Sequence, residues 1–141
     1  MININPYLNF AGTSEAAFNF YKEVFGGEIT MIMRFRDIPD DKTPENEKDK
    51  ICHISLQLPN GTLLMATDTL ESMGQKLIAG NNFYLSIGAE SREEADRIFT
   101  NLSAGGKVEM PMADMFWGDY FGITADKFGT QWMMSFNAGQ K

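Results

Sequence analysis

Two side chains, His53 and Asp119, have the chemistry that proton transfer needs. His53 is the only histidine of the chain, and imidazole is the side chain whose ordinary pKa lies nearest neutrality. We consider it as a general base or ligand contact, with a hydrogen-bonded structural role as the alternative. Asp119 lies between Trp117 and Phe121, where a buried carboxylate needs a partner. We expect Asp119 to bind a ligand cation or hydroxyl, or to pair with Arg34 or a second subunit.

The other reactive side chains exclude several kinds of site. Cys52 is the only cysteine, so the chain has neither an internal disulfide nor a cysteine-rich metal site. One histidine also cannot supply a pair of histidine ligands. In a strictly alternating strand Cys52 and His53 point to opposite faces, so we expect no nucleophile–base pair. The ten methionines suit a core and a tolerant pocket, because their side chains adapt to irregular spaces.

Composition narrows the class of protein. The 141 residues, 43% hydrophobic and 22% charged, are enough for one folded domain with a core. The net charge of −7 disfavours nucleic acid and anionic membranes, which bind through clustered Lys and Arg. No apolar stretch is long enough to span a bilayer. The first residues lack the features of a secretory signal, and one cysteine fits a reducing compartment, so we expect a cytoplasmic location.

Hydrophobic periodicity predicts a strand, a helix and three strands in the first half. The expected elements are strand 2–10, a helix from Thr13 or Ser14 to Gly26-Gly27, and strands 28–36, 51–58 and 62–67. Residues 37–50 are rich in charged and amide side chains. They predict a long solvated loop, which is either a lid or simply mobile.

The second half repeats this order. Its expected elements are strand 82–88, a helix capped by Ser91 and ended by Gly105-Gly106, and strands near 107–112, 116–124 and 130–136. Ser14 and Ser91 are 77 positions apart, whereas Met65 and Met133 are 68 apart, so the first half carries extra residues in its long loop. Neither half closes a core alone. We therefore predict an α+β domain over residues 1–141 with two βαβββ modules, about 1–75 and about 80–141.

Several stretches also carry a family resemblance: Pro6–Gly12, Phe20-Tyr21 with Phe25-Gly26, Gly106–Met110, Phe116-Trp117-Gly118, and Thr124–Gly129 with Trp132. Together they resemble the PhnB-like branch of the vicinal oxygen chelate superfamily, which includes glyoxalase I, extradiol dioxygenases and bleomycin- and fosfomycin-resistance proteins. The resemblance implies a glyoxalase-like fold with one curved eight-stranded mixed sheet, two helices outside it and a concave cavity. It also implies a homodimer.

In metal-dependent members, the first and last strands of each module supply the ligands. The last-strand positions here are Met65 and Met133, and thioethers are poor ligands for Zn, Ni, Mg or Fe(II). The first-strand positions fall near Asn5 or Pro6 and near Asn82 or Phe83. We therefore expect no metal and no other cofactor. PhnB-like proteins are sometimes described as demethylubiquinone methyltransferases, but this sequence shows no glycine-rich cofactor loop for a methyl donor.

Strand parity and the resemblance predict seven ligand-binding residues: His53, Met65, Tyr84, Trp117, Asp119, Phe121 and Met133. They would line the concave face, with residues 37–50 as a lid; exposure of this face to water or to a dimer partner is the alternative. The repeat pairs Met65 with Met133 and His53 with Phe121, which suits a ligand with one polar and one flat apolar part.

We expect a protein that binds a small organic molecule without the metal site. The first alternative is an isomerase, lyase or transferase with His53 and Asp119 as acid–base groups. A weaker alternative is a metal-dependent, glyoxalase-like activity.

Overall fold

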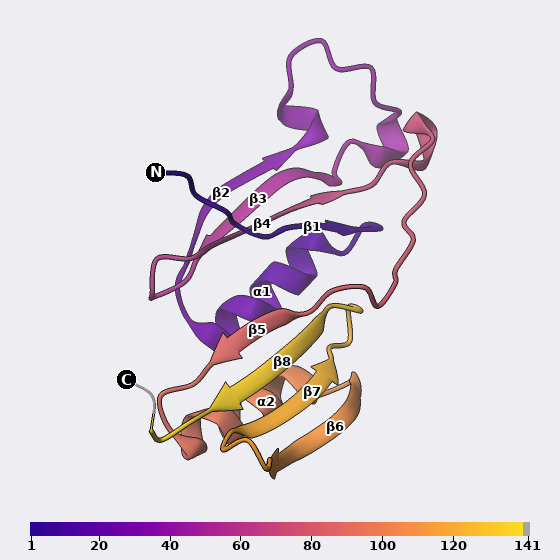
Figure 1. Cartoon of the computed structure of the whole chain (residues 1–141). Coiled ribbons are helices and arrows are strands. Elements are labelled where there is room, and N and C mark those ends of the chain that lie inside the picture. Colours follow the sequence, from indigo (N-terminus) through magenta and orange to yellow (C-terminus); the bar gives the residue numbers. More distant parts are fainter. Residues whose placement is uncertain (140–141) are drawn as a thin grey trace. The chain divides into compact units, whose positions relative to one another are not determined.

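The computed structural model describes residues 1–139, and the chain divides into two compact units, Met1–Ile78 and the part from Ala79 onward (Figure 1). Each unit contains one strand, one α-helix and three further strands in that order. The predicted α+β fold of two βαβββ modules is therefore confirmed. Neither α-helix, nor any other helix in residues 1–139, is long and apolar enough to cross a bilayer.

The first unit is a four-stranded sheet with one helix on it. Its strands have the order β1-β4-β3-β2; β1 runs parallel to β4, and the other neighbours are antiparallel. Helix α1 packs against one face, mainly on β3 (Figure 1). The elements are β1 (Tyr7–Phe10), α1 (Ser14–Phe25), β2 (Glu28–Arg34), β3 (Ile51–Gln57) and β4 (Leu63–Asp68).

Period-two alternation determines which side chains enter this core. Leu8 and Phe10 are buried, whereas Tyr7, the residue before Leu8, is 48% exposed. On β3, Ile54 and Leu56 are completely buried against α1. After the helix, Gly27 has φ +94°, and a Cβ there would lie 2.2 Å from the carbonyl oxygen of Gln57. Only glycine fits both requirements, so the chain can turn tightly into β2.

A distant carboxylate, rather than the side chain at the cap position, accepts a hydrogen bond from the first turn of helix α1. Thr13 occupies the cap position, but its side chain makes no capping hydrogen bond. Instead Asp68, at the end of β4, accepts the Ser14 N–H through Oδ1 at 3.0 Å and the Ile51 N–H through Oδ2 at 2.8 Å. Asp68 is 3% exposed, so its two hydrogen bonds join the helix start to the sheet inside the core.

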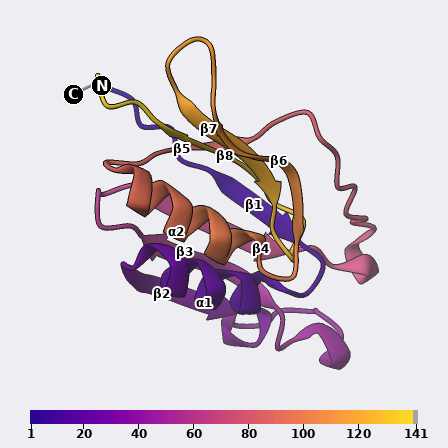
Figure 2. The ribbon, with the colours of Figure 1, turned by 90° about the horizontal axis from the view of Figure 1, so that it is seen from below.

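The second unit repeats the arrangement with the strand order β5-β8-β7-β6. Helix α2 lies along one face of this sheet (Figure 2). Ser91 caps it as predicted, because its Oγ accepts the Glu94 N–H at 3.0 Å. The elements are β5 (Leu85–Gly88), α2 (Arg92–Ser103), β6 (Lys107–Asp114), β7 (Tyr120–Ala125) and β8 (Gln131–Phe136).

Strand pairing differs from the expected continuous sheet. Among residues 1–139, the backbone ladders form two four-stranded sheets, one in each unit. The first strand of each unit is also shorter than predicted, because only Tyr7–Phe10 and Leu85–Gly88 pair with the last strands. Alternating side chains continue further toward the N-terminus in both cases, but alternation alone does not supply a pairing partner.

Residues 37–50 contain more order than a solvated loop needs. The 3₁₀ turns η1 (Phe35–Asp37) and η2 (Glu45–Glu47) bracket the segment, and Thr43 and Glu47 are buried. A further 3₁₀ turn, η3 (Glu71–Met73), follows β4.

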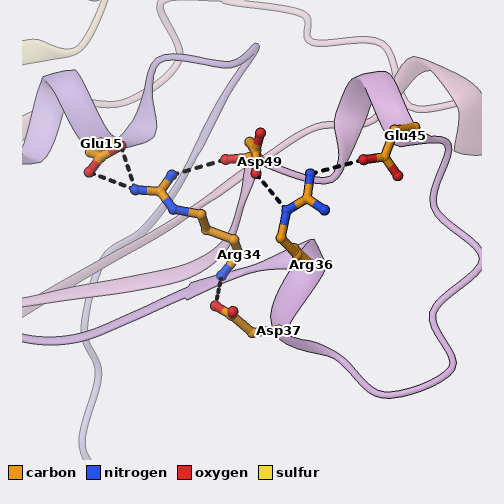
Figure 3. A network of polar contacts seen from close by, with 6 residues as sticks. All are labelled: Glu15, Arg34, Arg36, Asp37, Glu45 and Asp49. Carbon is orange, nitrogen blue, oxygen red and sulfur yellow. Dashed lines mark hydrogen bonds and ion pairs between the residues drawn. The ribbon is translucent and has the colours of Figure 1, made fainter.

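Two arginines hold the ends of this segment together (Figure 3). Arg34 Nη2 donates to both carboxylate oxygens of Glu15 on α1 at 2.9 Å, and its Nη1 donates to the Asp49 carbonyl at 2.9 Å. Arg36 binds the Asp49 carboxylate at 2.9 Å and Glu45 at 3.2 Å. The hydrogen bond and the charge of Arg36 lower the pKa of Asp49. Arg34 therefore pairs with Glu15; the sequence had offered it as one of three alternative partners of Asp119.

Candidate functional site

A row of side chains crosses the helix-free face of the first sheet. The registers place Tyr7 beside Met65, Met65 beside Ser55, and Ser55 beside Met31, so the row passes through all four strands. Residues paired across a ladder share a face, and Tyr7 is opposite in direction to the buried Leu8. The face is therefore a mixture of thioethers and hydroxyls.

His53 joins two of these hydroxyls. Its Nδ1 lies 3.0 Å from the Tyr7 hydroxyl oxygen, and its Nε2 lies 2.7 Å from Ser55 Oγ. The Tyr7 and His53 rings have centroids 5.6 Å apart at an angle of 46°. Ser55 is only 5% exposed. The structure thus contains a hydrogen-bonded chain from an exposed phenol to a buried serine. His53 was predicted as a site residue from the sequence, whereas its partners Tyr7 and Ser55 were not.

The alternation that separated Cys52 from His53 fails at this point of β3. Arg34 pairs with Ile51 and Met33 with His53, so β3 has one extra residue here, as in a β-bulge. Ile51 and Ile54 are both buried in the core, and Cys52 and His53 lie between them. The prediction of opposite faces was therefore wrong.

The thiol of Cys52 is nevertheless not activated. Burial raises its pKa, and the Asp41 carboxylate raises it further. Nucleophilic cysteines need the opposite shift. The pKa of Tyr7 is raised as well, first by the burial of its own hydroxyl and then by the charge of Cys52.

The second sheet presents a more apolar face at the equivalent positions. Its row runs Ser86, Met133, Ile123 and Met110 across the four strands. The registers make Met133 equivalent to Met65, because each is the last-strand residue between a first-strand and a third-strand partner. Two residues before Ile123, Phe121 then takes the place of His53. The pairing expected from the repeat therefore agrees with both ladders.

Trp117 and Asp119 lie in a hairpin loop, and their predicted place on a strand was wrong. Met115 N–H donates to the Asp119 carbonyl at 2.8 Å, and Gly118, with φ +102°, closes the turn. Asp119 accepts the Trp117 Nε1–H at 2.9 Å and the Asn137 Nδ2–H at 2.8 Å. Both carboxylate oxygens are thus used to hold the loop. The strand begins only at Tyr120, because residues 115–119 turn before the ladder resumes.

An aromatic cluster surrounds this loop. Trp117, which is 51% exposed, contacts Phe121 edge-on with ring centroids 6.0 Å apart, and Phe116 with centroids 5.0 Å apart. Phe116 is almost fully exposed. Tyr84, also predicted as a ligand contact, precedes β5 by one residue and is partly buried.

The positions that hold a metal in the resembling proteins do not suit one here. The residue beside Met65 is Tyr7, not Asn5 or Pro6, and the residue beside Met133 is Ser86. A thioether and a phenol in the first unit, like a thioether and a hydroxyl in the second, are poor donors for Mn, Zn or Ni, which prefer imidazole and carboxylate. Within residues 1–139, no three side chains of His, Cys, Asp or Glu gather to hold an ion.

Comparison with known proteins identifies the relatives of this arrangement. The family model described as 3-demethylubiquinone-9 3-methyltransferase matches residues 2–135. Protein PA1353 from Pseudomonas aeruginosa is 34% identical, with a TM-score of 0.87 over 97% of this chain and 98% of that one. A PhnB protein from Bacillus cereus, described as a putative 3-demethylubiquinone-9 3-methyltransferase, is 28% identical, with a TM-score of 0.79 over 96% and 99% of the two chains.

The fold extends to a more distant protein. The fosfomycin resistance protein FosX from Listeria monocytogenes, solved with Mn(II) and sulfate, has a TM-score of 0.65 at 11% identity, over 97% of this chain and 94% of that one. This likeness shows a common fold. The vicinal oxygen chelate fold expected from the sequence is therefore confirmed.

Proposed function

Since the chain belongs to the PhnB-like family of the vicinal oxygen chelate superfamily, we propose that it binds a small organic molecule on a helix-free sheet face, without a divalent metal. The observation that supports this proposal most is the hydrogen-bonded set Tyr7–His53–Ser55, which shares its sheet face with methionines of the neighbouring strands. A few polar groups set in an adaptable apolar surface are typical of small-molecule sites.

The second sheet supports the same proposal in a different way. Its equivalent face replaces His53 with Phe121, which contacts Trp117. Exposed aromatic rings offer a stacking surface for flat ligands. We propose Met133 and Tyr84 as further contacts on this unit, and Asp119 as the residue that holds Trp117 in place.

Methyl transfer is not proposed. Glycine-rich loops that bind nucleotide cofactors precede a helix and direct its N-terminus at a phosphate. The glycine pairs of this chain do the reverse, because Gly26 and Gly27 follow α1 and Gly105 and Gly106 follow α2. We therefore do not extend the methyltransferase activity in the family model's description to this chain.

A second candidate is general acid–base catalysis by His53, of isomerase, lyase or transferase type. It is favoured by the two hydrogen bonds of the imidazole, which connect it to an exposed hydroxyl. Asp119 is less suited to the same role, because two donors already occupy its carboxylate.

We also propose that the protein is a cytoplasmic homodimer. The edge strand β2 exposes Met31 and Ile32, each 44% accessible, beside an unpaired backbone edge. Sedimentation equilibrium at micromolar concentration would show a dimer, and a monomer would contradict this part of the proposal.

Thermal-shift screening of a small-molecule library tests the binding function. Ligands that raise the melting temperature of the wild-type protein should have weaker effects on His53→Ala or Trp117→Ala. Lys22→Ala, on the exposed side of α1, is the control and should respond like wild type. Ligands that stabilise both site variants as strongly as wild type would place binding elsewhere.

A further inference from the structure

We propose that Tyr7 donates its hydroxyl hydrogen to the carbonyl oxygen of an uncharged, largely apolar ligand, in a direction set by Ser55 and His53. This inference rests on the binding function proposed above and specifies its polar contact. It follows from the hydrogen-bond requirements of three residues and from the absence of positive charge around them.

A neutral imidazole fixes the donor–acceptor direction of the two hydrogen bonds that join Tyr7, His53 and Ser55. It has one N–H donor and one bare nitrogen acceptor, and both nitrogens of His53 are hydrogen-bonded. Two arrangements remain. In the first, Ser55 donates to Nε2, Nδ1–H donates to the Tyr7 oxygen, and the Tyr7 hydrogen is free. In the second, Tyr7 donates to Nδ1, Nε2–H donates to Ser55 Oγ, and the Ser55 hydrogen is free.

Burial distinguishes the two arrangements. Ser55 is 5% exposed, and its Oγ has no other hydrogen-bond partner among the described residues. The second arrangement would leave a buried hydroxyl hydrogen without an acceptor, which is costly. The first leaves the free hydrogen on Tyr7, which is 48% exposed and open to water or ligand. The structure therefore favours Tyr7 as an outward donor.

Two further observations keep that donor in place. Burial and the charge of Cys52 raise the pKa of Tyr7, so its hydroxyl keeps its proton at neutral pH. Its ring also lies against the His53 imidazole at 5.6 Å, which limits where the hydroxyl can point.

The surrounding side chains determine the charge of the ligand. No Lys or Arg occupies a strand position on this face of the first unit. Arg34, the basic residue of β2, is bound to Glu15 of α1. A carboxylate or phosphonate would lose hydration here without gaining a countercharge. A carbonyl needs only the donor that Tyr7 supplies, and Met31 and Met65 can contact an apolar frame.

The direction of the hydrogen bonds between Tyr7, His53 and Ser55 can be measured without a ligand. Since His53 is the only histidine, a long-range ¹H–¹⁵N spectrum of the tag-free protein contains one imidazole. At about pH 8 we expect the Nδ1–H tautomer. Ser55→Ala should shift the tautomer population toward Nε2–H. A wild-type protein in the Nε2–H form would overturn the donor assignment.

Three probes with one aromatic frame test the ligand class by calorimetric titration. They are 2-acetylnaphthalene, which has a carbonyl, 2-ethylnaphthalene, which lacks it, and 2-naphthoate, which is anionic. We expect the ketone to bind best, and we expect Tyr7→Phe to weaken its affinity about tenfold, the effect of one hydrogen bond. Tyr7→Phe should leave the affinity for 2-ethylnaphthalene unchanged. Tyr120→Phe, which removes a hydroxyl bound to Asp96, is the control.

The outcomes separate this inference from the binding function. Preferred binding of 2-naphthoate, or a ketone affinity that Tyr7→Phe does not change, overturns the inference and leaves small-molecule binding in place. If no probe binds the wild-type protein, both the binding function and the ligand class are contradicted for this frame. The tautomer of His53 then still decides the direction of the Tyr7 hydrogen bond.

Discussion

His53 Nε2 lies 2.7 Å from Ser55 Oγ, although only one residue separates the two along β3. Neighbours of this kind point to the same face of a strand, and here the shared face also receives Tyr7 from β1. One local and one long-range hydrogen bond therefore orient the only imidazole of the chain. Orientation by partners on both nitrogens is what a binding or proton-transferring histidine requires.

Removal of the serine hydroxyl should have a small but measurable effect on stability. We expect Ser55→Ala to lower the free energy of unfolding by about 1 kcal/mol, the net worth of one hydrogen bond. Urea denaturation measures this change. Ser86→Ala, at an exposed strand position, is the control and should change stability by less than about 0.5 kcal/mol. Equal losses of stability in the two variants would show that the Ser55 hydrogen bond does not stabilise the fold.

Asp68 should matter more for helix α1 than the residue at its cap position. Asp68→Ala leaves the buried N–H groups of Ser14 and Ile51 unpaired, so we expect a loss of about 2–4 kcal/mol. Thr13→Ala should cost little, because the Thr13 side chain makes no capping bond. Chemical denaturation followed by circular dichroism compares them. A larger loss for Thr13→Ala would contradict the structure.

Asp119 should act as a structural residue of its hairpin. Asp119→Ala removes the acceptor of Trp117 and Asn137, and we expect a loss of about 1–2 kcal/mol with a red-shifted indole emission. Glu109→Ala, an exposed substitution on β6, is the control. Unchanged stability and fluorescence would show that the carboxylate has another purpose.

The ion pair of Arg36 predicts a specific titration. Arg36 lowers the pKa of Asp49, so the carboxylate contributes stability above its ordinary pKa of about 3.9. That contribution is lost as the pH falls through the lower pKa of the folded state. In NMR titrations we expect Arg36→Gln to raise the pKa of Asp49, and Arg97→Gln to leave it unchanged. An unchanged pKa of Asp49 in the Arg36→Gln variant would refute the ion pair.

Two glycines with nearly the same backbone angle should differ in tolerance. Gly27 and Gly61 have φ of +94° and +93°, but only Gly27 has a backbone atom where a Cβ would stand. We expect Gly61→Ala to cost about 1–2 kcal/mol from strain alone and Gly27→Ala to cost clearly more. Equal losses in thermal denaturation would argue against the close contact with Gln57.

Periodicity and repeat spacing were enough to predict much of this molecule. The two βαβββ modules, the Ser91 cap and the equivalence of Met65 and Met133 all followed from patterns that depend on nearby residues. The same spacing correctly matched His53 with Phe121. These features are predictable because side-chain direction and repeat position are fixed locally.

The errors arose where one extra residue or a distant partner decides the structure. A register irregularity beside Ile51 cancels the alternation that separated Cys52 from His53. The hairpin closed at Gly118 removes Trp117 from the strand that parity assigned to it. The bond between Tyr7 and His53 spans 46 positions, and the sequence contains no local signal for it.

The central claim, binding on the helix-free faces, can be tested directly by ¹³C-methyl NMR of the methionines during titration with 2-acetylnaphthalene. Met65 and Met133 are on these faces, whereas Met134 is buried on the helix side and Met73 is exposed in η3. Our account predicts saturable shifts of the Met65 signal, the Met133 signal or both, with Met134 and Met73 unchanged. Shifts confined to Met73, or no saturable shift at either face, would contradict it.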